Sequence, residues 1–296
     1  MFLDDDSCQV LPVTDIPQEK SVFKYTYSDD VLKEYISQAD IIHINGYTAK
    51  GTAQAIRMAK KLGKKVVYTA HWHPFDRLSR PLLGKAFFYM MIAPQIRKNV
   101  DVITAINSED EAFFKKLHSN VVRIPHWLIS SGTPQQEVER KKNMILFVGR
   151  LNDSVKGISH LLALPKGKYE IHCVGQGEAP TNREDFIFHI NVPKEELAAL
   201  YAQASLVVIP SRYEAFSYVA LEAMETGTPV LMSERVRIAD YLQGISGYNI
   251  FQYGNTEEFI SKIESTMEMS VDVNSIKETF SRDKIKEQYK QLYLSL

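Results

Sequence analysis

The sequence predicts an α/β protein made of two Rossmann-like domains, each built on a parallel sheet. Short apolar runs of strand length alternate with segments of helical periodicity along most of the chain. A polar stretch interrupts this alternation between Ile124 and Met144. The length of 296 residues also suits two domains of about 150 residues each. We therefore expect one domain over residues 1–130 and a second over residues 131–296.

The predicted strands form two groups. The first comprises Ile41–Ile44, Lys65–Thr69, Val100–Thr104 and Val121–Ile124. The second comprises Met144–Val148, Tyr169–Val174, Phe186–Phe188, Leu206–Ile209 and Pro229–Met232. Residues 274–296 have the pattern of an amphipathic helix, for which packing back on the first domain is one option. Two such sheets facing each other would hold a ligand in the cleft outside the carboxyl ends of their strands.

Composition narrows the classes of function. The chain has 35 Lys and Arg against 36 Asp and Glu, so no overall basic field attracts nucleic acid and any anionic ligand must be held locally. Cys8 and Cys173 lack the spacing of a zinc site or a disulfide framework. The acidic start, MFLDDDSCQV, has no signal-peptide pattern, and no apolar run approaches the ~20 residues of a membrane span. These features predict a cytoplasmic protein.

The segment PSRYEAFSYVALEAMETGTPVL, from Pro210, combines two acidic side chains with a predicted helix start. Seven residues separate Glu214 from Glu222. Ser217 is placed to cap the helix and Gly227 to end it. Backbone N–H groups near Phe216 and Ser217 would then suit a phosphate, and Glu222, about one turn further on, would suit ribose hydroxyls. The alternative is that both glutamates are merely solvated at a helix end.

Two upstream segments also end predicted strands with glycine. In ILFVGRLNDSVKG, Gly149 permits a tight turn, and Arg150 and Lys156 supply two cations on the loop that follows. In CVGQGE, Gly175 is the first glycine of a Gly-x-Gly pair. The third glycine and acidic partner of a dinucleotide site are missing, which disfavours an NAD-dependent oxidoreductase.

Together these segments resemble the Glu-x7-Glu region of retaining glycosyltransferases with the GT-B fold, in particular glycosyltransferase family 4. The resemblance implies that Glu214 approaches the donor sugar and Glu222 holds the nucleotide ribose. It gives Arg150 and Lys156 the charge that develops on the leaving diphosphate. It assigns the rest of the donor pocket to Gly149, Gly175, Val192, Phe216 and Ser217. It further implies a UDP- or GDP-sugar as substrate and no metal cofactor.

The first half resembles the same family less strongly. DIIHINGY and KKVVYTAHWHP look like its paired strands, and the resemblance brings His71 to the sugar as a catalytic side chain. A histidine satisfied at a strand end, or a metal site with His43 and His73, are the alternatives. Asp4–Asp6 precedes any strand that could position it for metal binding and is expected to be solvated.

The chain departs from the family pattern at two places. Family members open with a strand and a glycine-rich loop, whereas no glycine precedes Ser28, so we expect a shortened N-terminal domain. Pro125-His126-Trp127 stands where the family has Pro-Asn-Gly. A non-catalytic nucleotide-sugar-binding subunit that needs a partner to complete its N-terminal half is therefore an alternative function. A GT-B epimerase or phosphorylase is another, although no pyridoxal-phosphate lysine segment is visible.

Residues 77–98 surround an apolar centre with five basic residues and no acidic one. They predict either a helix lying on an anionic membrane surface or a core helix with a basic edge. The first would suit a lipid-linked acceptor. The resulting hypothesis is retaining sugar transfer to a glycan or lipid-linked glycan, as in assembly of bacterial surface polysaccharide or lipopolysaccharide. A peripheral position on the inner face of the cytoplasmic membrane would follow. The base, the sugar and the acceptor are not specified by these motifs.

Overall fold

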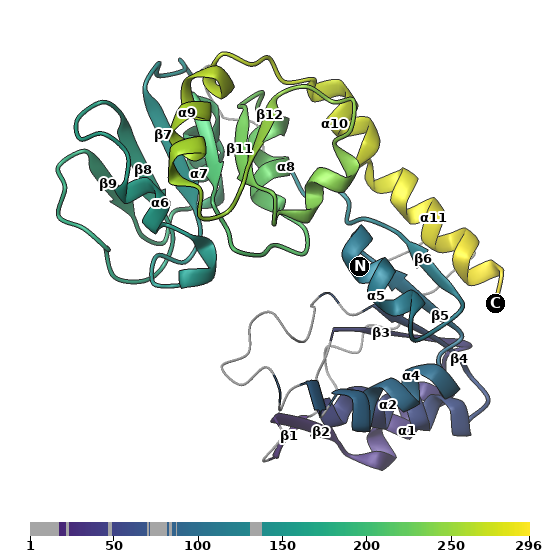
Figure 1. The fold of residues 1–296 in the computed structure, drawn as a ribbon. Helices are drawn as coiled ribbons and strands as arrows, with labels where there is room; N and C mark the ends of the chain where they lie inside the picture. The colour runs from purple at the N-terminus through teal and green to yellow at the C-terminus, as the bar shows by residue number, and fades with distance from the viewer. Residues whose placement is uncertain are drawn as a thin grey trace. The chain divides into compact units, whose positions relative to one another are not determined.

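The computed structural model describes residues 18–21, 24–46, 49–69, 71, 82, 85–86, 88–130 and 138–296. The chain divides into two compact units (Figure 1). Unit 1 comprises Met1–His126 together with Asp283–Leu296, and unit 2 comprises Trp127–Arg282. The division thus falls between His126 and Trp127, and the C-terminal segment belongs to unit 1. Each unit contains its own parallel sheet, as expected for an α/β protein.

Unit 1 is built on a four-stranded parallel sheet of order β3-β4-β5-β6. Its strands are β3 (Ile41–Asn45), β4 (Lys65–Thr69), β5 (Val102–Ala105) and β6 (Val121–Arg123). Its helices are α1 (Asp29–Ser37), α2 (Ala49–Lys61), the π-helical turn η2 (Phe88–Ile92) continued by α4 (Ala93–Asn99), α5 (Ser108–Lys115) and α11 (Arg282–Leu294). All four strands predicted in this half are confirmed.

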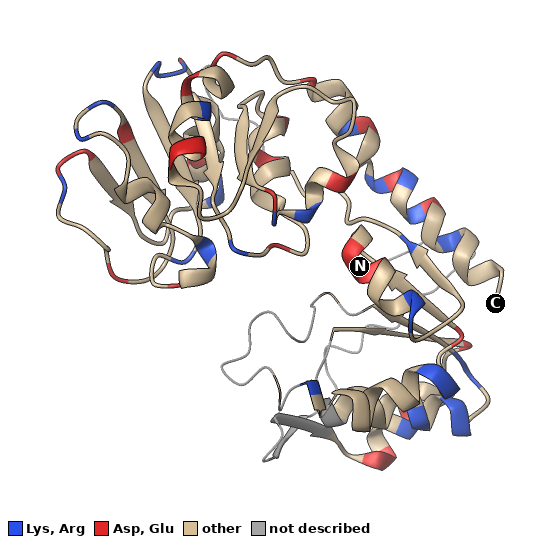
Figure 2. Cartoon of the chain, in the orientation of Figure 1, with Lys and Arg blue, Asp and Glu red and all other residues tan. Residues whose placement is uncertain are grey.

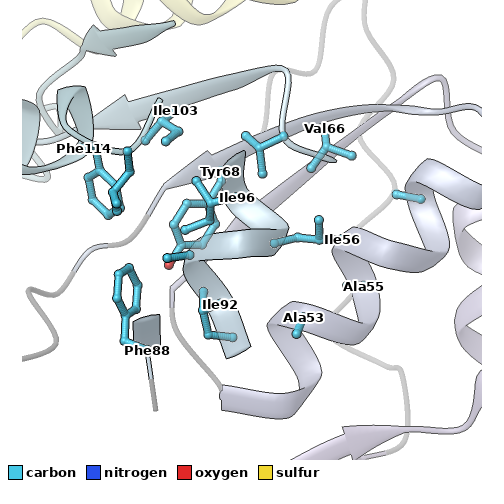
Figure 3. Close-up of a cluster of buried hydrophobic side chains, with 14 of the residues drawn as sticks. Ala53, Ala55, Ile56, Val66, Tyr68, Phe88, Ile92, Ile96, Ile103 and Phe114 are labelled. Atoms are coloured by element: carbon cyan, nitrogen blue, oxygen red, sulfur yellow. The ribbon is translucent and has the colours of Figure 1, made fainter. Parts of the chain in front are cut away.

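Helices α2 and α4 bury an apolar core against one face of the unit 1 sheet. Figure 3 shows Ile56 of α2 and Ile92 and Ile96 at the α4 end gathered beneath Tyr68. These side chains are 0–1% exposed. Full burial of each isoleucine contributes about 1.5–3 kcal/mol relative to exposure. The opposite face carries His43, Thr69 and Thr104, which hydrogen-bond to one another in a row.

Unit 2 is built on a six-stranded parallel sheet of order β12-β11-β10-β7-β8-β9. Its strands are β7 (Met144–Val148), β8 (Glu170–Val174), β9 (Phe186–His189), β10 (Leu206–Ile209), β11 (Val230–Ser233) and β12 (Tyr248–Phe251). Its helices are η3 (Ser154–Lys156), α6 (Ser159–Leu162), α7 (Lys194–Gln203), α8 (Tyr218–Glu225), η4 (Arg237–Tyr241), α9 (Thr256–Met267) and α10 (Val273–Thr279). The chain order runs outward from β7 on one side and from β10 on the other. The topological switch point therefore lies between β7 and β10, where open α/β sheets bind their ligands.

Three strands escaped prediction for reasons visible in the sequence. The hairpin β1 (Gln18–Ser21) and β2 (Lys24–Tyr27) is antiparallel and largely polar in sequence. β12 is the edge strand of its sheet, and Asn249 interrupts its apolar run. Neither has the continuous apolar pattern of a strand buried on both faces.

The expected helix over 274–296 is two helices. α10 begins after Asp272, whose side chain accepts a hydrogen bond from the Ser275 N–H at 3.0 Å. The fully buried Phe280 lies between α10 and α11, and its carbonyl accepts a hydrogen bond from the Leu128 N–H at 2.8 Å. The chain then enters unit 1, where the Tyr293 hydroxyl is 2.5 Å from His43 Nδ1.

Across the described ranges, every helix is too short or too polar to traverse a lipid bilayer.

Candidate functional site

Two loops meet at the switch point of unit 2, one after β7 and one after β10. The Arg212 N–H donates to the Val155 carbonyl at 2.7 Å, which joins the loops. Gly157 has φ +70°, and a Cβ there would lie 1.8 Å from the Pro210 carbonyl oxygen. Only glycine permits both this backbone conformation and this approach. The contact fixes the position of Lys156, the residue before Gly157.

An ion pair spans these two loops. Lys156 Nζ lies 2.5 Å from Glu214 Oε1, and the side chains are only 19% and 15% exposed. The Ser211 hydroxyl donates to the same Oε1 at 3.1 Å. The Glu214 backbone bonds to the β11 loop in both directions, through Arg235 O and the Arg237 N–H. Lys156 and Glu214, 58 residues apart in the sequence, are therefore held together at the switch point.

Arg150 is the second predicted cation, and its partner is a different carboxylate. Arg150 Nη2 lies 2.5 Å from Asp153 Oδ2, with the arginine side chain 60% exposed. The other oxygen of Asp153 accepts the Val155 N–H at 3.0 Å and caps η3. Sequence reasoning missed Asp153, although an aspartate just before a short helix is a common capping signal. Arg150 thus lies on the Lys156 loop, and its guanidinium reaches solvent.

Helix α8 begins and ends as the sequence predicts. The Ser217 hydroxyl accepts a hydrogen bond from the Ala220 N–H at 3.4 Å, and Gly227 follows the helix with φ +77°. Phe216, just before the helix, is 6% exposed and packs edge-on against Phe280 at a centroid distance of 5.9 Å. Its side chain therefore has a packing role within unit 2.

Glu222 lies about one turn into α8, and its carboxylate accepts a hydrogen bond from a side chain of α7. The Tyr201 hydroxyl of α7 donates to Glu222 Oε2 at 2.7 Å. Burial raises the pKa of Glu222 above its ordinary value, while the hydrogen bond from Tyr201 and the charge of Lys194 act in the opposite direction. Tyr201 was not predicted as a site residue, because a tyrosine with apolar helix neighbours has the pattern of an ordinary core residue.

The glycines after β7 and β8 allow these strand ends to approach closely. A Cβ on Gly175 would lie 1.9 Å from the Gly149 carbonyl oxygen, and the Gly149 N–H donates to Val174 O at 2.9 Å. A Cβ on Gly149 would lie 3.4 Å from the Lys156 side chain. Val192 follows β9 in a half-buried position. The structure thus brings Gly149 and Gly175 beside the Lys156 loop.

The predicted histidine of unit 1 lies beyond β4. His71 has φ +49°, its Nε2 is 2.9 Å from Asn45 Oδ1, and its ring stacks on His126 at 5.0 Å. Burial lowers the pKa of His71 below its ordinary value. Asn45 and His126 were not among the predicted site residues. His126 belongs to the Pro-His-Trp segment that departs from the family pattern.

His43 is satisfied within the unit. Its Nε2 lies 2.7 Å from the Thr69 hydroxyl, and its Nδ1 faces Tyr293. Among the described residues, no three His, Cys, Asp or Glu side chains gather as a metal site would require. His73, Cys8 and Asp4–Asp6, which the sequence analysis considered, lie outside the described residues.

The segment 77–98 is described in part, because residues 77–81, 83, 84 and 87 lie outside the described ranges. Phe88 and Ile92 are buried in the unit 1 core. Leu82 and Met90 are 82% and 71% exposed. The helix of η2 and α4 therefore both packs against the core and presents apolar side chains at the surface.

Comparisons with known proteins cover the part of the chain that carries these residues. Residues 142–269 match the family described as Glycosyl transferases group 1, a range that contains the loops after β7, β8 and β10. An uncharacterized 41.2 kDa protein from the cps region of Klebsiella pneumoniae is 27% identical over 70% of this chain. The MMP alpha-(1->4)-mannosyltransferase of Mycolicibacterium hassiacum is 26% identical over 66% of this chain. The chain spans 64% and 53% of the length of these relatives.

A solved structure extends the comparison beyond unit 2. The Anabaena protein HepE, solved in complex with UDP and glucose, has a TM-score of 0.67 at 16% identity, covering 90% of this chain and 82% of its own. The likeness concerns the fold and includes elements of both units. The chain has the GT-B fold, and its residues 142–269 match the model of the glycosyl transferases group 1 family.

Proposed function

We propose that this protein transfers a sugar from a nucleotide-sugar donor to a glycan or lipid-linked glycan. The observation that carries the proposal is the Lys156–Glu214 pair at the switch point of unit 2, with Glu222 on the helix that follows. In a nucleotide-sugar ligand, the diphosphate would pair with Lys156, the sugar with Glu214 and the ribose with Glu222. The names of relatives, a mannosyltransferase and a protein of the cps region, support a place in polysaccharide or glycolipid synthesis.

The chemistry follows from where charge develops. As the glycosidic bond stretches, negative charge grows on the leaving diphosphate, and cations already in place stabilise that state more than the ground state. Lys156 is held by the Gly157–Pro210 contact, and the exposed Arg150 is free of the core and able to move toward a ligand. Glu214, paired with Lys156, would face the donor sugar. This division of roles needs no metal ion or other cofactor.

We further propose retention of anomeric configuration. The acceptor hydroxyl would attack from the face that the diphosphate leaves, and a phosphate oxygen would take its proton. No side chain is then required as a nucleophile. Nuclear magnetic resonance of the first-formed product tests this step, since an inverted anomeric configuration would exclude it. Full activity in the presence of a metal chelator is the matching expectation for metal independence.

Donor binding is the most direct test of the function. Calorimetry should show that the chain binds UDP or GDP and the corresponding sugar nucleotides. Lys156→Ala and Glu222→Ala should each weaken binding about 10- to 100-fold, as expected when a hydrogen bond to a charged group is lost. Lys166→Ala and Glu184→Ala, at exposed positions of unit 2, should bind as wild type does. A folded protein that binds none of these nucleotides would contradict the proposal.

The exposed apolar side chains of the η2 and α4 region favour an acceptor at a membrane surface. Leu82, Tyr89, Met90 and Met91 are 38–82% exposed, and Lys and Arg gather at the ends of α2 and α4 in Figure 2. Cations near anionic headgroups contribute roughly 1 kcal/mol each. We propose that this surface contacts anionic lipid on the inner face of the cytoplasmic membrane.

Sedimentation with vesicles tests the membrane contact. The wild type should sediment with vesicles containing phosphatidylglycerol at low salt and less so at high salt. The double variant Leu82→Ser, Met90→Ser should remain in the supernatant, whereas Ile190→Ser, at a 50% exposed position of unit 2, should sediment normally. Equal sedimentation of all three proteins would remove the proposed contact without affecting the donor site.

A further inference from the structure

We propose that Tyr201 is a positioning residue, which fixes the Glu222 carboxylate so that it receives the hydroxyl groups of the donor ribose. The inference rests on the proposed function, because it concerns the nucleotide that the protein would bind. Tyr201 makes this contact through its side-chain hydroxyl, 2.7 Å from Glu222 Oε2.

Tyr201 combines a buried ring with a hydrogen bond to Glu222. Its side chain is fully buried, and its ring lies in the interior between α7 and α8. Side chains on a helix lean toward the helix N-terminus, so Tyr201, near the end of α7, reaches back toward the carboxyl edge of the sheet. There it meets the half-buried Glu222. The hydroxyl approaches the carboxylate from the protein interior.

The chemistry of a carboxylate explains what this contact achieves. An ionised carboxylate only accepts hydrogen bonds, and its two oxygens offer about four sites. Tyr201 occupies one site on Oε2 and thereby restricts rotation of the carboxylate, leaving Oε1 to accept from a ligand. A ribose presents two neighbouring hydroxyl donors. A carboxylate already oriented pays less conformational entropy when it binds them.

The groups around Glu222 keep it suited to this task. The charge of Lys194 and the Tyr201 hydroxyl favour the ionised form, against burial and the nearby Glu225. The backbone of Tyr201 has a separate structural role, because its carbonyl accepts a hydrogen bond from the Thr228 hydroxyl at 2.7 Å. Removing only the phenolic oxygen therefore leaves the packing of α7 in place.

The substitution Tyr201→Phe isolates the hydroxyl. Tyr169→Phe is its matched control, since the Tyr169 hydroxyl also donates to a glutamate of unit 2, Glu264 Oε1, at 3.4 Å. Thermal unfolding should show that both variants fold. Each would then be titrated by calorimetry with UDP, GDP and their 2′,3′-dideoxy analogues.

The expected result is selective for ribose. Tyr201→Phe should weaken binding of the ribonucleotide about tenfold and leave binding of its dideoxy analogue unchanged. Tyr169→Phe should change neither. In a Glu222→Gln background, Tyr201→Phe should have a much smaller effect, because the charged acceptor is gone.

Three outcomes overturn the inference in distinguishable ways. If the wild type binds none of the nucleotides, the proposed function fails and this inference with it. If the wild type binds ribonucleotide and dideoxy analogue equally, the donor site survives but the ribose role of Glu222 fails. If the wild type prefers the ribonucleotide and Tyr201→Phe keeps that preference, only the role of Tyr201 is wrong.

Discussion

At the scale of single residues, the site depends on glycines as much as on charges. The Pro210 carbonyl oxygen occupies the volume that a Cβ at position 157 would need. The Lys156–Glu214 pair spans the same two loops, so a larger residue at position 157 should displace Lys156 from Glu214. The backbone thus determines where the side-chain chemistry is placed.

Gly157→Ala should therefore weaken donor binding at least tenfold, by moving Lys156, as well as lowering stability. Gly244→Ala is the control, because Gly244 also has positive φ, +81°, but nothing lies within 4 Å of an added Cβ. That variant should lose only about 1–2 kcal/mol to the left-handed backbone conformation and bind donor normally. Thermal unfolding and calorimetry measure the two effects, and equal binding by both variants would contradict the argument.

The candidate site could be predicted in part because its chemistry is local in sequence. Glu214 and Glu222 share one segment, and Lys156 lies on a short loop between Gly149 and Gly157. The partners could not be predicted, since pairing depends on rotamers and tertiary distance. Asp153 forms an ion pair with Arg150, and Tyr201 donates a hydrogen bond to Glu222 from another helix. Nothing in the pattern of α7 separates Tyr201 from a purely apolar core position.

At the scale of elements, strands buried on both faces were predictable from continuous apolar runs. β4, β7 and β10 appear close to their predicted bounds. The edge strand β12 was missed because one polar residue is tolerated at an edge. The break between α10 and α11 was missed because Phe280, which turns inward there, fits the amphipathic pattern as well as any helical residue.

The contact between helix α11 and β3 should be less stable at acidic pH. Burial, with a smaller contribution from His71, lowers the pKa of His43 to about 3. The folded state thus resists protonating His43, so its contribution to stability is complete above the unfolded pKa of about 6.5 and declines as pH falls from there toward 3. His71 and His126 act in the same direction, because their pKa values are also lowered.

The measurement is the free energy of unfolding in urea between pH 7.5 and 5. Wild-type stability should fall over this interval, and His43→Gln should be less stable at pH 7.5 but show a shallower decline. Parallel curves for wild type and His43→Gln would refute the assignment.

At the scale of the whole molecule, the net charge is close to zero although the candidate site is rich in charged side chains. The formal net charge is -1, yet the charged side chains of the candidate site in unit 2 lie close together in the fold, on the loops after β7 and β10 and on α8. A nucleoside diphosphate should therefore slow amide hydrogen exchange in the segments after β7, β8 and β10 while leaving β4 and β5 unchanged. Mass spectrometry of exchanged peptides gives the map, and protection limited to unit 1 would argue for a different binding site.

The return of α11 to unit 1 has a consequence for biosynthesis. His43 and Tyr293 are 250 residues apart. At a synthesis rate of about 5–20 residues per second, a ribosome needs on the order of tens of seconds to make the chain between them. All of unit 2 is translated in that interval. The nascent chain can therefore complete unit 2 before α11 is synthesised. Until then His43 lacks its contact with Tyr293 and is accessible to a chaperone.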